Sequence, residues 1–505
     1  MAKKENIEAA TQTTSQELYS FLFEACNILR GPINQDEFKS YVTPILFLKR
    51  ISDVYDEETE EALKISGGDK EFAAFPEEHT FIIPDGCHWS DIRNTSQNVG
   101  KAIVKAMTGI ERANPDKLNG LFTSFDDASW TDKSKLDDER LKNLVEHFST
   151  RKLGNKNYSA DVMGDAYEYL IKKFADLSKK NAGEFYTPRP VVHLMVEILN
   201  PKSGESVYDP ACGTGGMLIE AIHYIHDDKM TYGRIYGQEK NLSTSAIARM
   251  NLYLHGAKDV QIRQGDTLRD PKFIEKGKLQ TFNCVLANPP FSLKEWGAKQ
   301  FSSDKYGRAI WGTPSDNCAD YAWVQHMVKS MDINNGRCAV ILPQGALFHK
   351  NDKKIREKMI ETDLLDTVIT LAPGIFFSTG VHACILYFNN HKPKDHIGKI
   401  LMVDASDIYT AKRAQNVLEE NDVNEIFKLF TSYGNVVGKS AVVPIPEIAD
   451  NEYSLMVNNY IEQPKIETTP PEVVRKNYFA ALEKVKNSEA EMKKLLNEGG
   501  YLNEQ

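Results

Sequence analysis

Between residues 206 and 403, short apolar segments alternate with longer segments whose apolar residues recur at helical spacing. The apolar segments that predict strands are 206–208, 234–237, 260–263, 282–287, 338–342, 367–371, 383–388 and 400–403. The segments that predict helices are 217–226, 242–255, 321–331 and 353–361. Because strands joined through helices pair in parallel, this alternation predicts an α/β fold with a Rossmann-like, doubly wound parallel sheet and helices on both faces.

Two further regions flank the predicted sheet. Residues 1–150 carry apolar side chains at helical spacing and predict an N-terminal helical domain, and the sheet domain is expected over 155–405. Residues 406–505 are polar and predict a largely helical region that ends in a helix over 472–496. The apolar residues of that helix are too sparse for a core of its own, so it is either a solvated helix or a surface for a partner.

Composition restricts the classes of function. The chain of 505 residues has 61 basic and 71 acidic side chains, so its net charge is −10, and nucleic-acid contacts need a local basic surface or a partner. Seven scattered cysteines without a C-x-x-C pair argue against a disulfide framework or a zinc ribbon, and no metal site is expected. No apolar run approaches the ~18 residues of a membrane span, and the N-terminus lacks signal-peptide features. The expected location is cytoplasmic.

The segment 209–217 (DPACGTGGM) follows the first predicted strand and opens a predicted helix, as a nucleotide-binding loop does. Gly213, Gly215 and Gly216 let the backbone pass close to a ligand that a Cβ would exclude. The dinucleotide pattern G-x-G-x-x-G and the P-loop Lys are both missing, which argues against NAD and ATP. The alternative is a tight strand-to-helix turn that binds nothing.

Two acids follow the next two strands. Glu239 ends the second strand, where a carboxylate can accept hydrogen bonds from both ribose hydroxyls. Asp266 follows the third strand, where it can accept from an adenine amino group. Either acid alone could be an ordinary loop residue. Together, behind a glycine loop, they indicate a pocket for an adenosine-bearing cofactor.

The tetrapeptide Asn288-Pro289-Pro290-Phe291 comes directly after the fourth predicted strand. Its two prolines fix φ at successive residues, so the loop is rigid and aims the Asn288 side-chain oxygen and the Pro289 carbonyl at one point. Two acceptors at one point suit a planar amino group, each taking one hydrogen, and Phe291 can stack on the ring that carries the amine. The alternative is a rigid turn with a core Phe.

The strand order brings the two loops together. In the order 3-2-1-4-5 of a doubly wound sheet, strands 1 and 4 are neighbours, and ligands bind beyond their carboxyl ends. A cofactor on the glycine loop would therefore face an amine on the Asn288 loop. Before the sheet, Thr187 and Pro188 read as the N-cap and first residue of a helix over 191–199.

These residues carry a family resemblance. The chain resembles S-adenosylmethionine-dependent amino-methyltransferases of the γ class, and more closely the modification (M) subunit of bacterial type I restriction–modification systems. The matching segments are Leu29-Arg30-Gly31, Phe47-Leu48-Lys49-Arg50, Gly164 to Leu170, Gly183 to Arg189, Asp209 to Met217, Gly237-Gln238-Glu239, Gly265 to Leu268, Leu286 to Ser292 and Gln325-His326-Met327.

The resemblance implies roles for individual residues. Asn288, Pro289 and Phe291 would hold the target adenine, with Phe376 or Phe377 against its other face unless those two pack in the core. Glu239 would hold the ribose of S-adenosyl-L-methionine and Asp266 its adenine. The remaining cofactor-binding residues would be Tyr186, Thr187, Pro188, Asp209, Gly213, Thr214, Gly215, Gly216 and Met217. Cys212 would be a small buried filler.

The resemblance also implies the substrate and partners. Methyl transfer would occur at N6 of an adenine flipped out of double-stranded DNA, because an adenine inside the duplex cannot reach the crevice. A separate specificity (S) subunit would read the sequence, flanked by two M subunits, and a restriction (R) subunit could join them. Basic stretches at 151–156 and 172–180 could contact phosphates. The alternatives are a solitary DNA adenine methyltransferase, a protein or RNA amino-methyltransferase, and an inactive assembly scaffold.

Overall fold

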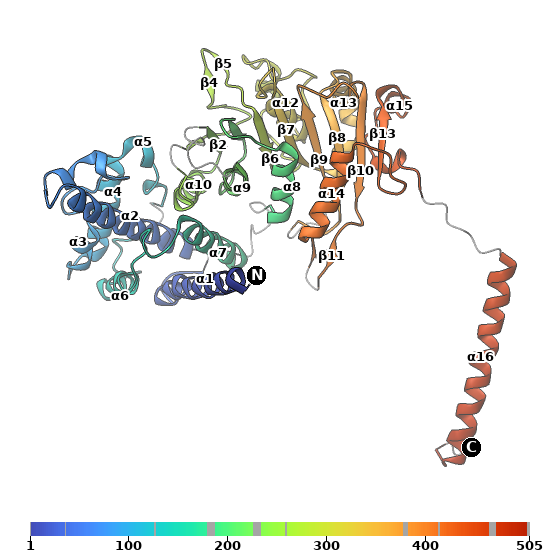
Figure 1. The fold of residues 1–505 in the computed structure, drawn as a ribbon, viewed down its shortest axis with the longest axis horizontal. Coiled ribbons are helices and arrows are strands. Elements are labelled where there is room, and N and C mark those ends of the chain that lie inside the picture. Colours follow the sequence, from blue (N-terminus) through green and yellow to red (C-terminus); the bar gives the residue numbers. More distant parts are fainter. Residues whose placement is uncertain are drawn as a thin grey trace. The chain divides into compact units, whose positions relative to one another are not determined.

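The computed structural model describes residues 2–35, 37–125, 128–178, 187–225, 234–257, 260–376, 382–412, 415–463 and 471–501. The chain forms two compact units, residues 1–461 and residues 462–505 (Figure 1). The first unit holds a helical region followed by a large sheet with helices on both sides, and the second unit is a single helix.

The central sheet has nine strands in the order β13-β10-β8-β9-β7-β6-β1-β2-β3. Their bounds are β1 Val207–Asp209, β2 Ile235–Glu239, β3 Gln261–Gln264, β6 Cys284–Ala287, β7 Arg337–Pro343, β8 Leu365–Leu371, β9 Ala383–Asn389, β10 Lys399–Ala405 and β13 Ser440–Pro444. The first five predicted strands are β1, β2, β3, β6 and β7, and their parallel order 3-2-1-4-5 is confirmed. The loops after β1 and β6 therefore leave adjacent strands at the same edge of the sheet.

The sheet is not parallel throughout, which corrects the sequence prediction. β9 inserts between β7 and β8 and runs antiparallel to both, and the edge strand β13 is antiparallel to β10. A parallel pair needs a crossover connection, usually a helix, whereas the described residues between β8 and β9 contain none. β13 lies within the region expected to be a largely helical tail, so residues 406–461 complete the sheet and its packing.

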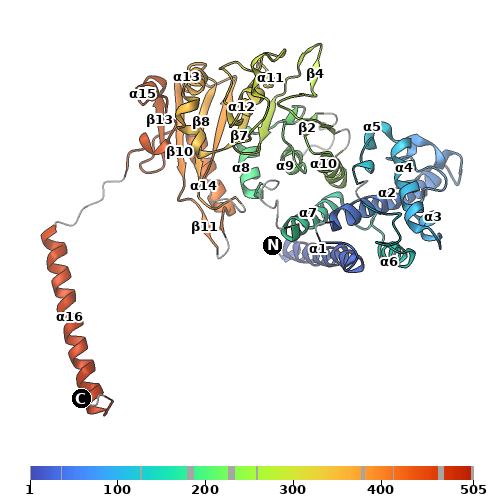
Figure 2. The same ribbon diagram turned by 180° about the vertical axis from the view of Figure 1, so that it is seen from behind.

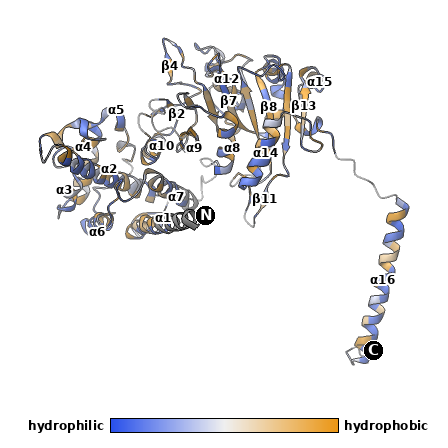
Figure 3. Ribbon diagram, viewed as in Figure 1, coloured by the Kyte–Doolittle hydropathy of each residue, from blue (hydrophilic) through white to orange (hydrophobic). Residues whose placement is uncertain are grey.

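Two apolar layers cover the sheet (Figures 1 and 2). One face packs against α8 (Arg189–Leu199), α9 (Gly216–Ile225) and α14 (Glu420–Ser432), and the other against α12 (Asp320–Lys329) and α13 (Lys353–Glu361). The helices α8, α9, α12 and α13, together with α10 (Leu242–Leu254), match five predicted helices to within about two residues. The central strands β6, β7 and β8 are buried and apolar, as expected where both faces of a sheet are covered. Their hydropathy is shown in Figure 3.

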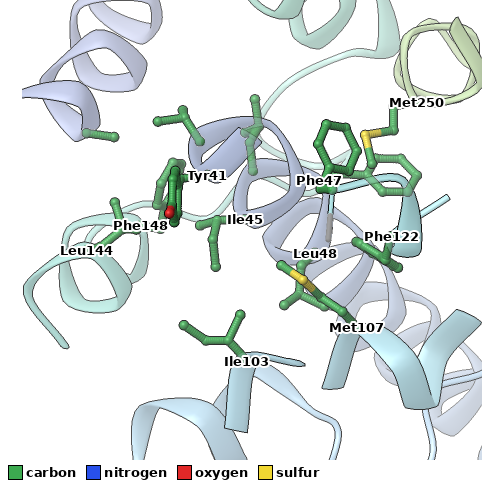
Figure 4. Close-up of a cluster of buried hydrophobic side chains, with 14 of the residues drawn as sticks. Tyr41, Ile45, Phe47, Leu48, Ile103, Met107, Phe122, Leu144, Phe148 and Met250 are labelled. Carbon is green, nitrogen blue, oxygen red and sulfur yellow. The ribbon is translucent and has the colours of Figure 1, made fainter. Parts of the chain in front are cut away.

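The N-terminal region is helical, as expected, and shares its core with the sheet domain. Its helices are α1 (Ala2–Leu29), α2 (Phe38–Ile65), α3 (Trp89–Arg93), α4 (Val99–Ala113), α5 (Pro115–Leu118), α6 (Asp138–Ser149) and α7 (Ala160–Ser178). Met250 of α10 lies beside Phe47 and Phe122 in that core (Figure 4). Two side chains of α10 also donate hydrogen bonds to this region. Arg249 Nη1 donates to the Asn119 carbonyl, and the Tyr253 hydroxyl donates to the Lys117 carbonyl at 3.3 Å. The helical region is therefore packed onto one helix of the sheet domain.

The Phe47-Leu48-Lys49-Arg50 segment of α2 fixes the connection to α7. Lys49 forms a buried ion pair with Asp53, whose carboxylate also accepts from the Leu153 N–H at 2.7 Å. Arg50 is buried and donates to the carbonyls of Leu153 and Tyr158. This segment therefore has a structural role in holding residues 153–158.

Short elements complete the described fold. They are the hairpins β4 (Ile274–Glu275) with β5 (Lys278–Leu279) and β11 (Thr410–Ala411) with β12 (Asn416–Val417), the helices α11 (Ala298–Ser302) and α15 (Ile445–Asp450), and the 3₁₀ turns Phe72–Ala74, Pro76–Glu78, Thr123–Phe125, Gln344–Leu347, Lys350–Asp352 and Val457–Asn459.

The second unit is α16 (Pro471–Glu498), on which no residue is buried. Its exposed apolar side chains are Val473, Val474, Tyr478, Phe479, Leu482, Val485, Met492 and Leu495, interleaved with charged residues (Figure 3). Across the described residues, no helix combines the length and the hydropathy needed to cross a membrane.

Candidate active site

The glycine loop between β1 and α9 is open on one side. Gly213 and Gly215 have φ of 52° and 86°, the left-handed region in which a Cβ is strained. A Cβ added to Gly213 or Gly216 would meet no heavy atom within 4 Å, so the loop backbone faces space. Asn251 of α10 donates to the Thr214 carbonyl at 3.0 Å and fixes the loop from behind. The loop is thus a rigid cradle with room for a ligand against its backbone.

Two acids lie against this cradle, the buried Asp209 and the partly buried Glu239. Asp209 is 2% exposed and accepts from the Ala211 N–H at 2.9 Å. Burial raises the pKa of Asp209 to about 8, and the nearby Glu239 charge acts in the same direction. Glu239 accepts from the Gly213 N–H at 3.1 Å and the Asn241 N–H at 2.8 Å, and burial raises its pKa as well. A cation bound beside these two carboxyl groups would stabilise their ionised forms, so the pair suits a ligand that carries positive charge.

Asp266, which follows β3, forms an ion pair with Lys240 at 2.9 Å. Two buried side chains hold its loop in place. Gln238 donates to the Gly265 carbonyl at 3.1 Å, and Arg308 donates to the carbonyl of Thr267 at 2.8 Å. The Thr267 hydroxyl in turn donates to the Pro210 carbonyl at 2.6 Å, which joins this loop to the glycine loop.

The Asn288 loop presents one unused acceptor. The Asn288 Nδ2 donates to the Thr187 hydroxyl at 2.9 Å. Its Oδ1 is buried and has no hydrogen-bond partner within the described residues, although buried oxygens are nearly always paired. Pro289 is buried, and the partly buried Phe291 packs edge-on against Phe376, with ring centroids 6.2 Å apart and planes at 65°. The loop therefore offers a hydrogen-bond acceptor beside an aromatic ring.

Thr187 does not cap α8, contrary to the prediction. The helix begins at Arg189 with Pro188 as its N-cap and Pro190 in its first turn, where a missing N–H costs nothing. The Thr187 side chain contacts Asn288 instead, across 101 positions of sequence. Tyr186 lies outside the described residues.

Other predicted residues are placed as follows. Phe376 is 9% exposed and belongs to one of the apolar layers that cover the sheet, so it packs in the core. Phe377 lies outside the described residues. Cys212 is buried, and burial raises the pKa of its thiol well above the usual range, as a filler requires. Lys152 pairs with Asp56 at 3.4 Å and Lys156 with Glu60 at 2.7 Å, so these basic residues are already neutralised by α2.

Sequence reasoning missed Asp320. This buried residue begins α12 and accepts from the Ser292 N–H at 2.8 Å, immediately after the Asn288 loop. Ser292 has φ of 50°, in the left-handed region that is uncommon for residues other than glycine, and the hydrogen bond to Asp320 stabilises this conformation. An acid in the first turn of a helix is common, and nothing local in the sequence distinguishes this one.

Comparison with known proteins identifies the family. Residues 158–469 match the family model described as N-6 DNA Methylase, and residues 18–148 match the HsdM N-terminal domain. The MjaVIII type I restriction enzyme methylase subunit of Methanocaldococcus jannaschii is 30% identical over 90% of this chain and 79% of its own length. The HindI methylase subunit of Haemophilus influenzae is 30% identical over 80% of this chain and 93% of its own length.

A solved structure agrees in fold as well as in sequence. The type I restriction–modification methyltransferase subunit of Streptococcus thermophilus superposes with a TM-score of 0.76 at 25% identity, covering 89% of this chain and 100% of that one. Both matched domains and both relatives indicate the same family. The chain therefore belongs to the N-6 DNA methylase family, among the methylase subunits of type I restriction enzymes.

Proposed function

We propose that this chain transfers a methyl group from S-adenosyl-L-methionine to N6 of an adenine flipped out of double-stranded DNA. The observation that carries the proposal is the Asn288 Oδ1 on the loop after β6, which has no hydrogen-bond partner in the described part of the chain. It lies at the same sheet edge as the open glycine loop after the adjacent β1. The Asn288 Oδ1 can accept a hydrogen bond from an amine, and the open backbone of the glycine loop leaves room for a nucleoside cofactor.

The residues at the glycine loop fit this cofactor. The open Gly213 and Gly216 leave space for it, and Glu239 has lone pairs left for the ribose hydroxyls after accepting two backbone N–H groups. Asp209 places a second carboxyl beside the loop, which suits a ligand that carries positive charge. When bound, the cofactor supplies a methyl group on a sulfonium, which is a good leaving group.

The Asn288 loop would activate the acceptor amine. Adenine N6 is a weak nucleophile because its lone pair is delocalised into the ring. If Asn288 Oδ1 and the Pro289 carbonyl each accept one N–H, the nitrogen becomes pyramidal and its lone pair is localised. That interaction is stronger in the transition state than in the ground state, which is the condition for raising the rate. The rest of the rate increase would come from holding the amine nitrogen in line with the methyl group that is transferred.

A basic segment beside the site would contact the DNA backbone. Residues 292–308 leave the Asn288 loop and are anchored by the Ser292 contact to Asp320 and by Arg269, which donates to the Trp296 carbonyl at 3.3 Å. Lys294, Lys299 and Lys305 on this segment are exposed, and none of them pairs with a carboxylate among the described residues. Free ammonium groups on a fixed segment next to the catalytic loop suit phosphate binding.

The lysine segment gives a quantitative prediction. Replacing Lys294, Lys299 and Lys305 together by Ala is expected to weaken duplex binding and to reduce the slope of log K against log salt by roughly 0.9 for each phosphate that is no longer neutralised. Fluorescence anisotropy of a labelled duplex over a salt series measures both. The matched control is Lys152→Ala with Lys156→Ala, which removes lysines that already have acidic partners. An equal change in slope for both variants would show that the 292–308 segment has no special role.

Recognition of the target sequence would come from a separate subunit. The net charge of −10 argues against recognition by this chain alone. The apolar side chains of α16 are exposed, and this helix belongs to a separate compact unit. We assign this helix to contacts with a specificity subunit, in an assembly with a second copy of this chain and, in some complexes, a restriction subunit.

Transfer of labelled methyl groups tests the proposed function. The chain with its specificity subunit is expected to label duplex DNA at N6 of adenine and to leave RNA and protein acceptors unlabelled. The chain alone is expected to label DNA only at background level, because the specificity subunit is missing. A chain ending at Ile461, mixed with the specificity subunit, is expected to give the same background labelling because it lacks α16. Labelling of a defined site by the chain alone would identify a solitary enzyme, and labelling of protein or RNA would identify a different amine acceptor.

A further inference from the structure

Asn288 must be held in one of two amide orientations for the proposed chemistry. Its Oδ1 and Nδ2 are nearly equal in shape, yet only Oδ1 can accept from an amine. With the amide reversed, Nδ2 would face the N–H groups of the target, donor against donor. Proline rigidity fixes the backbone of the loop but leaves the side-chain amide free to turn. Some other group must therefore set the amide orientation.

The structure assigns this task to Thr187. The Asn288 Nδ2 donates to the Thr187 Oγ1 at 2.9 Å, and Oδ1 is buried without a hydrogen-bond partner among the residues that the structure describes. Thr187 lies just before α8, where Pro188 and Pro190 restrict the backbone, so its hydroxyl is well placed as a fixed acceptor. We infer that Thr187 is a positioning residue, which keeps the acceptor atom of Asn288 directed at the target amine. This inference rests on the proposed function.

The hydroxyl also links the two halves of the site. A hydroxyl can donate as well as accept, so it selects one amide orientation only when its own hydrogen is committed elsewhere. Among the described residues the Thr187 hydroxyl has no acceptor for its own hydrogen, so that hydrogen is available to the carboxylate of the proposed cofactor. Occupancy of the cofactor site would then fix the Asn288 amide, and the acceptor pair for adenine would be complete only in the presence of the cofactor.

A binding experiment separates this role from a structural one. The complex of this chain with its specificity subunit is given duplexes of its own site, with the target base opposite an abasic site so that pairing contributes to neither base. One duplex carries adenine at the target and the other carries purine, which lacks the 6-amino group. Affinities are measured by fluorescence anisotropy with saturating sinefungin, a cofactor analogue without a transferable methyl group. The ratio of the two affinities reports recognition of the amine.

The expected ratio in the wild type favours adenine by about tenfold, the effect of one or two hydrogen bonds to a buried group. Thr187→Val keeps the branched shape but removes the hydroxyl, and is expected to bring the ratio close to one. Thr187→Ser keeps the hydroxyl and is expected to retain the preference. In the Asn288→Ala background, Thr187→Val is expected to change the ratio no further, because the two residues act as one unit. Omitting sinefungin is expected to lower the wild-type ratio.

The outcomes distinguish the two claims. A wild-type ratio near one would overturn the proposed use of Asn288 and the role of Thr187 with it. A clear wild-type preference that survives Thr187→Val, or that Thr187→Ser loses to the same extent as the Val variant, would overturn the positioning role alone. Methylation of the intact site by the wild-type complex, run in parallel, checks the proposed function separately.

Discussion

Replacing Asn288 by Ala is expected to lower the methylation rate by at least about a hundredfold, the usual effect of removing one group that stabilises a transition state. The variant loses the Oδ1 acceptor that has no other use among the described residues. Affinity for the cofactor is expected to change by less than about threefold, because Asn288 lies on the loop after β6 whereas the cradle lies after β1. Single-turnover methylation and calorimetric binding of a cofactor analogue measure the two effects.

The matched control for this prediction is Asn334→Ala, which removes an exposed Asn before β7, at the opposite edge of the sheet. It is expected to leave both the rate and the affinity unchanged. A rate in Asn288→Ala within a few-fold of the wild type would remove the proposed mechanism. Equal losses of rate and of cofactor affinity would place Asn288 in the cofactor site instead.

Replacing Asp209 by Asn is expected to change how stability depends on pH. Burial raises the pKa of Asp209 to about 8 in the folded chain, whereas the unfolded chain has the ordinary value near 4. Between these values the folded state holds a proton that the unfolded state has released. This group therefore stabilises the fold fully below about pH 4, and its contribution falls by about 1.4 kcal/mol per pH unit as the pH rises towards 8.

The amide of the variant cannot ionise but can still accept from the Ala211 N–H. Chemical denaturation of the cofactor-free chain at pH 5.5, 7 and 8.5 is expected to show that the variant gains stability relative to the wild type as the pH rises. The same variant is expected to bind the positively charged cofactor more weakly. Asp116→Asn, at an exposed position in α5, is the control and is expected to follow the wild type. Parallel pH curves for Asp209→Asn and the wild type would contradict the prediction.

The two loops of the candidate site could be predicted because each is a short segment with distinctive residues. Three glycines in a strand-to-helix loop and two prolines after a strand are constraints on the local backbone, and Gly213 and Gly215 adopt the left-handed conformation that favours glycine. The strand order 3-2-1-4-5 follows from the same alternation of strands and helices, and it brings the two loops to adjacent strands. Local conformation and the general rules of sheet winding were sufficient for this part.

The remainder depends on contacts between distant segments. No pattern near Thr187 predicts that its hydroxyl accepts from a residue 101 positions away, and a Thr before Pro reads more simply as a helix cap. Arg308 is buried although its segment is polar, because it satisfies the carbonyls of the loop after β3. The direction of β9 was also mispredicted, since apolar periodicity identifies a strand but does not tell which way it runs.

A structure of the assembled complex with sinefungin and a duplex of its own site tests the central claim most directly. The account predicts a target adenine outside the helix, with its N6 within hydrogen-bonding distance of both Asn288 Oδ1 and the Pro289 carbonyl, and its ring against Phe291. An adenine that reaches the crevice with its amino group directed elsewhere, or an Asn288 amide that contacts only protein, would contradict it.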